Sequence, residues 1–207
     1  MATGKAQLNG REAQRQETRQ RVYAAAIAEF KRTGMAAADV GVIAKEAGVA
    51  RGTFYFHFPT KEHVLAELER LEEARLASQL SRFLTAPHDL AGALAEVVRL
   101  MTVMERRVGK ALFSEMLALH FSPRRPEVLP GADQWGQYPA MTLAVQAVEL
   151  ARQRGEVYPG ADALRTAQFF MLGLYAMLIT SHDQPKAARA EILDNFLATV
   201  LRGVESR

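Results

Sequence analysis

The sequence predicts an all-α fold of about nine helices, in which a small N-terminal helical domain precedes a larger C-terminal one. Apolar residues recur at spacings of three and four along most of the chain. The segments with this pattern end at Gly or Pro, and several begin at an Asp or Thr suited to capping a helix. No segment offers a convincing strand or hairpin turn. The 207 residues are 49% hydrophobic, which is enough to bury a core in one or two domains.

Residues 1–13 are polar and poorly patterned, and we predict a mobile basic arm there. A first helix is expected over residues 14–33, with Gly34 as its left-handed stop. Its apolar positions repeat every four residues and are Val22, Ala26 and Phe30.

Asp39 is a suitable N-cap for a short second helix over residues 40–47, which Gly48 ends. The residues that this helix directs inward are Val40, Ile43, Ala44 and Ala47.

The segment from Thr53 to Phe58 has the β-branched and aromatic composition of a strand. A lone strand would leave its backbone groups unpaired, and nothing before Pro59 offers it a partner. In a helix, Phe54 and Phe58 lie together at a spacing of four. We therefore predict a helix over residues 51–57 that ends near Pro59.

A long helix is expected from Lys61 to about Leu84, with Thr60 as its N-cap. A loop that contains three prolines is expected over residues 121–138. The other helices are predicted over residues 89–107, 109–119, 139–154, 162–180 and 185–202. The predicted domains are residues 14–60 and 61–207.

The second and third helices, joined through Gly48, have the arrangement of a helix-turn-helix motif. In that motif the exposed face of the third helix can lie in the major groove of DNA. Residues 1–61 hold ten Lys and Arg against five Asp and Glu, a charge of +5, whereas residues 62–207 carry −2. A basic N-terminal segment that precedes a nearly neutral remainder indicates a protein that binds a polyanion such as DNA.

The stretch VYAAAIAEFKRTGMAAADVGVIAKEAGVARGTFYFHFPTKEHVLAEL, residues 22–68, resembles the N-terminal domain of the TetR family of bacterial transcriptional regulators. Its most specific part is IAKEAGVARGTFYFHFPTKE. The resemblance implies an all-α homodimer that binds a DNA operator and releases it when a small ligand enters the larger domain. The expected operator is double-stranded and palindromic, with two equal half-sites.

By position, the resemblance places Arg51, Gly52 and Thr53 at the start of the recognition helix, where the family reaches base edges. Arg51 is the candidate for guanine, because its guanidinium matches the O6 and N7 acceptors. The residues that the resemblance assigns to the DNA backbone, a sugar or a base are Tyr55, Phe56, His57 and Lys61.

The chain departs from the family pattern at two positions. Gly41 replaces a side chain that often contacts DNA, and Ala50 replaces the usual Ser that caps the recognition helix. Arg11, Arg15 and Arg19 of the N-terminal arm are candidates to compensate for these losses.

The larger domain shows no motif of an enzyme. Its histidines lack metal-ligand spacing, and the chain has neither a phosphate-binding glycine loop nor a nucleophile elbow. The chain has no cysteine, so neither disulfides nor thiolate chemistry are expected. We predict that it is not an enzyme and needs no cofactor or metal.

The helix around residues 169–179 is apolar on every side, so we expect a second copy of the chain to cover one face. The predicted homodimer interface comprises Phe170, Gly173, Met177, Leu193, Phe196, Leu197 and Val200. A dimer would place two recognition helices about 34–36 Å apart, one turn of DNA.

Methionine and aromatic residues gather in the second half of the chain, and such side chains form adaptable apolar pockets as well as ordinary cores. The predicted ligand-binding residues are Met101, Met104, Phe113, Met116, His120, Trp135, Tyr138, Met141, Phe169 and Tyr175. The candidate polar anchors are His120, Tyr138, Glu115 and Gln146. We expect a small hydrophobic or aromatic ligand.

The sequence thus predicts a ligand-responsive, DNA-binding repressor that acts as a homodimer. The chain has no signal peptide and no apolar run of about 20 residues, so we expect a cytoplasmic protein that does not span a membrane. The alternative is a helical ligand-binding or scaffold protein whose N-terminal domain docks a protein partner.

Overall fold

The structure, a computed structural model, describes residues 2–127 and 138–205. These ranges contain nine α-helices and, instead of a strand, a single antiparallel bridge between Val157 and Glu205. The chain divides into two compact units, residues 1–68 with 115–128, and residues 69–114 with 129–207. The all-α prediction is confirmed for the described residues.

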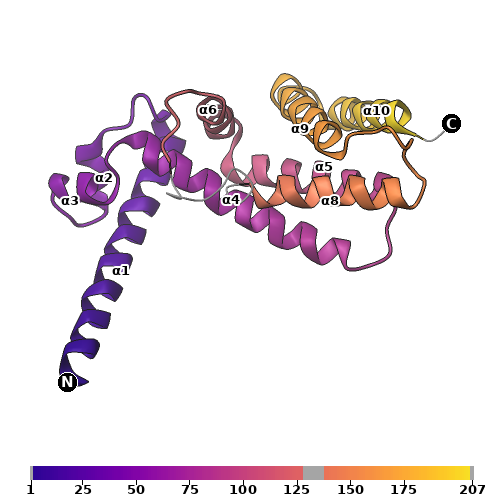
Figure 1. Cartoon of the computed structure of the whole chain (residues 1–207). Coiled ribbons are helices and arrows are strands. Elements are labelled where there is room, and N and C mark those ends of the chain that lie inside the picture. The colour runs from indigo at the N-terminus through magenta and orange to yellow at the C-terminus, as the bar shows by residue number, and fades with distance from the viewer. Residues whose placement is uncertain (1, 128–137, 206–207) are drawn as a thin grey trace. The chain divides into compact units, whose positions relative to one another are not determined.

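The first unit is built on three helices: α1 (Ala2–Thr33), α2 (Val40–Glu46) and α3 (Arg51–His57) (Figure 1). Gly34 and Gly48 follow α1 and α2 with φ angles of +79° and +66°, a conformation that glycine adopts without strain. The buried core of these helices comprises Val22, Ala26, Phe30, Val40, Ile43, Ala44, Ala47, Phe54 and Phe58, as predicted.

The start of α1 differs from the prediction. Residues 2–13 continue the helix, so its expected start at Gln14 was too late. This segment includes three alanines, which have high helix propensity, and Leu8 is its single large apolar side chain. An analysis based on apolar periodicity therefore could not detect it.

Despite its strand-like composition, the segment Arg51–His57 is the helix α3, as predicted. Phe54 is fully buried, and its ring centroid lies 6.3 Å from that of Phe58. Phe58 itself has φ −136° and ψ 99°, because the following Pro59 disfavours the helical conformation in the residue before it. Proline thus ends the helix, while the ring of Phe58 still reaches the core.

The second unit contains α5 (Leu90–Val108), α8 (Pro139–Gln153), α9 (Ala163–Thr180) and α10 (Lys186–Val204). Asp89 and Asp162 cap α5 and α9 with their side chains. Helix α9 packs against both α8 and α10, and α5 also packs against both. In the described part of the second unit, each predicted helix begins and ends within two residues of the observed helix.

Two helices belong to both units, since the division falls within α4 (Lys61–Leu84) and α6 (Lys110–His120). The predicted boundary at residue 60 differs from this division. The first two turns of α4 group with the first unit because they contribute buried side chains, such as Val64 and Leu65. The end of α6 also groups with that unit.

Helix α9 has a mean hydropathy of 1.3 over 18 residues, so by length and composition alone it could cross a membrane. A core helix of a soluble protein passes the same test. Helix α9 contains Arg165, and it buries residues against its neighbours, among them Phe170 and Leu174. Its apolarity is therefore accounted for by packing within the second unit and by one exposed apolar face.

Candidate nucleic-acid interface

The exposed face of α3 begins with Arg51 and Gly52, which are both exposed, and with the partly exposed Thr53. Tyr55 lies one turn after Arg51 and is 44% exposed. Its hydroxyl hydrogen-bonds the Arg51 guanidinium, which raises the pKa of Arg51 above its ordinary value. The helix thus presents a cation and a phenol side by side, while Phe54 faces the core.

Phe56 and His57 lie at the other end of α3, beside α1. Phe56 is 67% exposed, and its ring is edge-on to the His57 ring. The Arg15 guanidinium lies 5.3 Å from the centroid of Phe56. Partial burial, and then the charges of Arg15 and Arg19, lower the pKa of His57. His57 is therefore predominantly neutral at pH 7.

Lys61 binds the loop between α1 and α2. Its Nζ donates to the carbonyl oxygens of Ala36, at 2.8 Å, and Ala38, at 3.2 Å. The ammonium group has three donors, so one N–H can still reach a phosphate. The contribution of Lys61 to DNA binding stays a prediction, with a structural role in this loop added to it.

Glu115 holds the same loop from α6. Both carboxylate oxygens accept the Met35 backbone N–H, at 3.0 and 3.2 Å. Glu115 was predicted as a polar anchor for a ligand, but this contact gives it a structural partner within the first unit. Sequence reasoning missed the contact because 80 residues separate the two groups.

The glycine at position 41 has a local explanation. The Asp39 side chain caps α2 by accepting the Gly41 N–H at 2.5 Å. A Cβ atom at residue 41 would lie 2.9 Å from that carboxylate oxygen, so the tight cap favours glycine. Ala50, in contrast, gives α3 no side-chain cap.

The predicted ligand residues fall in both units. Met116 and His120 belong to the first unit, with the His120 ring 4.7 Å from that of Phe121. The second unit contains Met101, Met104, Phe113, Tyr138, Met141, Phe169 and Tyr175, and Trp135 lies outside the described residues. Gln146 is exposed.

Within the second unit, Tyr175 is the most perturbed of these groups. Burial raises its pKa, and the nearby acidic groups Glu73 and Glu69 raise it further, together with Tyr138. Its hydroxyl therefore stays protonated. Met101, Met104 and Phe113 are buried, as both a pocket lining and a core require.

Two predicted roles on α9 do not fit the exposure of the side chains. Phe169 was predicted to line a ligand pocket, but it is 72% exposed. Phe170 was predicted at a dimer interface, but it is fully buried and stacks on Phe196 at 5.7 Å. The exposed apolar face of α9 carries Phe169 and Leu172 instead. Successive residues of a helix lie on different sides, so Phe170 faces α10 while Phe169 does not.

The other predicted interface residues have mixed surroundings. A Cβ atom at Gly173 would lie 2.5 Å from the Phe196 ring, so this glycine serves packing between α9 and α10 of one chain. Leu193 is buried. The partly exposed residues, which can still contact a second copy, are Met177, Phe196, Leu197 and Val200. In the part of the chain that the structure describes, no group of three His, Asp or Glu side chains could hold a metal ion.

Residues 22–68 match the model of a family described as bacterial regulatory proteins, tetR family. The match begins inside α1 and ends at Leu68, where the first segment of the first unit also ends. Over these residues the chain has the N-terminal domain of the TetR family.

Characterised TetR-family proteins are similar to this chain over different lengths. The transcriptional regulator AcrR of Shigella flexneri is 35% identical over 94 residues, which are 45% of this chain and 43% of AcrR. The regulator UidR of Escherichia coli K12 is 23% identical over 93% of this chain and 96% of UidR. The match to AcrR thus spans less than half of that protein.

The fold is also that of a solved TetR-family protein. The structure of Thermus thermophilus FadR, a repressor in complex with lauroyl-CoA, superposes with a TM-score of 0.71. The two chains are 24% identical, and the superposition covers 91% of this chain and 96% of FadR. The two chains therefore share a fold.

Proposed function

We propose that this chain is a sequence-specific, DNA-binding transcriptional repressor that acts as a homodimer and responds to a small hydrophobic ligand. The observation that carries the proposal is the exposed face of α3, where Arg51 and Tyr55 lie side by side on a TetR-family helix-turn-helix. Arg51 is the residue suited to reading guanine, and the phenol is suited to a phosphate or a base.

A homodimer is supported by the exposed apolar face of α9. Leu172 is 49% exposed and lies beside Phe169 on that face. Two large apolar side chains at a spacing of three on an exposed helix favour a partner surface. A two-fold axis through this surface would supply the second recognition helix that two half-sites of an operator require.

The ligand is proposed to be hydrophobic and to bind in the second unit. The buried methionines of α5 support this, since their side chains adapt to apolar shapes. The protonated Tyr175 hydroxyl beside Glu73 supports a polar anchor. FadR of Thermus thermophilus was solved with lauroyl-CoA, whose acyl chain belongs to this chemical class.

Release of DNA is proposed to follow from a shift of α4 and α6, which belong to both units. Each of these helices also holds the loop between α1 and α2, through Lys61 and Glu115 respectively. A ligand that prefers a second position of these helices would displace the loop and lower the population of the DNA-binding form.

The proposal is tested with the purified full-length chain and DNA flanking its own gene, by fluorescence anisotropy with excess unrelated DNA. We expect the protein to stay bound to one specific site in the presence of the unrelated DNA. A footprint should show protection of two half-sites. Binding that is only salt-labile and independent of sequence would contradict the repressor and favour a domain that docks protein. A thermal-shift screen of hydrophobic compounds then identifies ligands, and these should release the DNA.

Replacing Arg51 with alanine is expected to relax specificity at one base pair of each half-site by about 1–3 kcal/mol, because a bidentate contact is lost. The measurement is competition among operators that vary at single positions. Lys61→Ala is the comparison, since it should weaken binding to all of these duplexes by the same factor. A uniform loss in the Arg51 variant would contradict base reading.

The operator affinity is expected to rise as the pH falls below about 6.5, the ordinary pKa of histidine. In the free protein the pKa of His57 is lowered, so its ring is neutral near pH 7. A bound phosphate favours the protonated ring and raises this pKa, so binding takes up a proton. The gain is complete below the pKa of the free protein and is lost as the pH rises through that of the complex.

The pH dependence is measured by anisotropy at constant ionic strength. The His57→Gln variant keeps a hydrogen-bonding side chain that does not titrate in this range, so its affinity should vary less with pH than that of the wild type. Equal pH dependence in the two proteins would show that His57 does not meet a phosphate.

A further inference from the structure

A row of arginines on α1 lies beside the recognition helix. Arg11, Arg15 and Arg19 are spaced by four residues, so they share one side of α1. Residues 11–21 contain four Arg and two Glu. From Arg11 to Arg19, each arginine lies one turn further along α1 toward the core of the first unit. The three side chains have different surroundings.

Arg19 is committed to the fold. Its guanidinium lies 4.5 Å from the centroid of the buried Phe58 ring, and its Nη1 lies 3.1 Å from the Glu67 carboxylate. Because the Glu67 side chain is buried, this pair holds the start of α4 against α1. Arg19 is therefore a structural residue.

Arg15 lies one turn nearer the N-terminus, at the exposed end of α3. Its guanidinium lies over the exposed Phe56 ring at 5.3 Å, which fixes the cation without burying it. The Glu12 carboxylate is 4.0 Å away, and both side chains are more than half exposed, so this pair contributes little in water. The charge of Arg15 is therefore presented to solvent beside the recognition helix.

Arg11 is exposed and follows after one more turn, about 6 Å along the helix axis. Helix α1 extends well past α2 and α3 at this end, as the indigo ribbon shows (Figure 1). The two arginines therefore form a basic strip that begins at the end of α3 and continues beyond it.

We propose that this α1 strip, Arg11 and Arg15, binds phosphates of the operator outside the base pairs that α3 contacts. The inference rests on the proposed function. A guanidinium presents paired donors that match phosphate oxygens, and the Phe56 ring holds that of Arg15 in place, which lowers the entropy cost of the contact. The strip supplies backbone contacts that Gly41 and Ala50 do not provide.

The test is a salt titration of operator binding by the full-length chain. Each phosphate contact adds about 0.9 to the slope of log K against log salt concentration. The double variant Arg11→Ala/Arg15→Ala should lower that slope by about 1.8 for each bound protomer. It should weaken binding to the operator and to a scrambled duplex by the same factor.

The matched control is Arg82→Ala/Arg99→Ala, which removes the same charge from exposed positions in the second unit. A slope that is unchanged in the α1 variant, or lowered equally in the control, would overturn the proposed strip. The wild type separates the α1 strip from the proposed repressor function. If the wild type binds no specific operator, the proposed repressor function is refuted.

A second variant tests the role of the aromatic ring. Phe56→Leu should weaken operator binding in the wild-type background, and less so in the Arg15→Ala background, since the ring acts partly through Arg15. Equal effects in both backgrounds would show that Arg15 does not depend on Phe56. Circular dichroism of each variant confirms that the helices are retained.

Discussion

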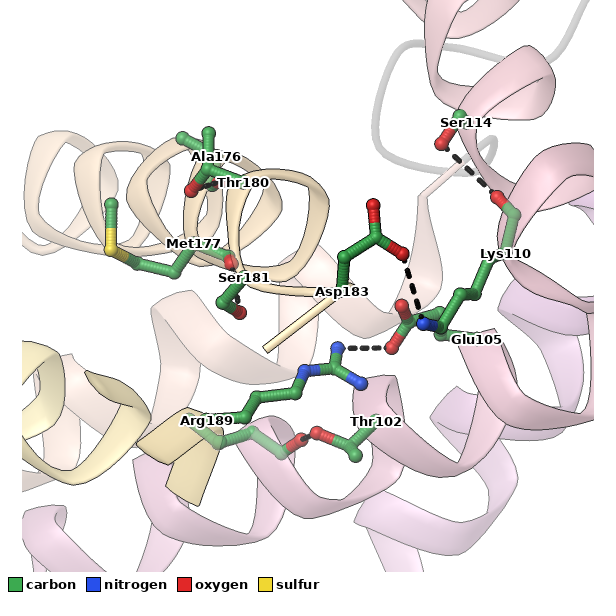
Figure 2. Close-up of polar contacts among 11 residues, drawn as sticks. Thr102, Glu105, Lys110, Ser114, Ala176, Met177, Thr180, Ser181, Asp183 and Arg189 are labelled. Carbon is green, nitrogen blue, oxygen red and sulfur yellow. Dashed lines mark hydrogen bonds and ion pairs between the residues drawn. The ribbon is translucent and has the colours of Figure 1, made fainter. Parts of the chain in front are cut away.

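Replacing Arg189 with methionine is expected to lower the free energy of unfolding by about 3–5 kcal/mol, because it leaves the Glu105 carboxylate buried without its counter-charge. Glu105 on α5 is 1% exposed, and its side chain pairs with Arg189 on α10 (Figure 2). Its second carboxylate oxygen, Oε1, has no hydrogen-bond partner among the described residues. The guanidinium is therefore its main source of stabilisation.

Urea unfolding followed by circular dichroism measures this loss. The double variant Glu105→Leu/Arg189→Met should recover most of the stability, since a well-packed apolar pair can replace a buried ion pair. Arg99→Met is the matched control, because Arg99 pairs with Glu96 on the same helix but is 57% exposed. Its loss should stay below about 1 kcal/mol, and an equally small loss for Arg189→Met would contradict the prediction.

The Phe54→Ala variant is expected to lower the stability of the first unit by about 3–5 kcal/mol. Phe54 is fully buried, and its ring lies 5.3 Å from Tyr55 and 6.3 Å from Phe58. Removing it leaves a cavity among α1, α2 and α3, in the buried core that these helices share. DNA binding should be lost together with the fold of α3.

Phe56→Ala is the matched control, being the same substitution two residues away on the same helix. Because Phe56 is exposed, its stability loss should be within about 0.5 kcal/mol, while operator affinity falls. In a strand, the two rings would lie on one face and have equal burial. Equal losses in thermal unfolding would therefore contradict the helical arrangement of these residues.

Much of the helical pattern follows from local rules that operate within a few residues. Gly34 and Gly48 end helices because their φ angles are positive, and Asp89 and Asp162 begin helices because their side chains accept backbone N–H groups. Pro59 ends α3. Such effects depend on neighbours in the sequence, so reading the chain was enough to find them.

The exposed face of α3 was also predictable. A helix of seven residues that buries Phe54 must direct Arg51 and Tyr55 elsewhere. The resemblance of residues 22–68 to a known family then supplied the expected role of that face. The DNA contacts themselves stay a prediction.

The sequence could not reveal contacts between distant segments. Arg189 and Glu105 are 84 residues apart, and Glu115 and Met35 are 80 apart. Each of these partners looks like an ordinary charged or loop residue in the sequence. Only the packing of helices brings them together, and burial then makes their charges and hydrogen bonds costly to lose.

The sequence by itself determined that this protein is helical, where most of its helices begin and end, and which face of α3 is exposed. The tertiary structure decided that Phe170 is buried while Phe169 is exposed, that Glu115 and Lys61 hold one loop, and that Arg15 lies over Phe56. The physical reason is the range of the forces involved. Capping and periodicity act over one or two turns, whereas burial and charge pairing depend on which helices pack together.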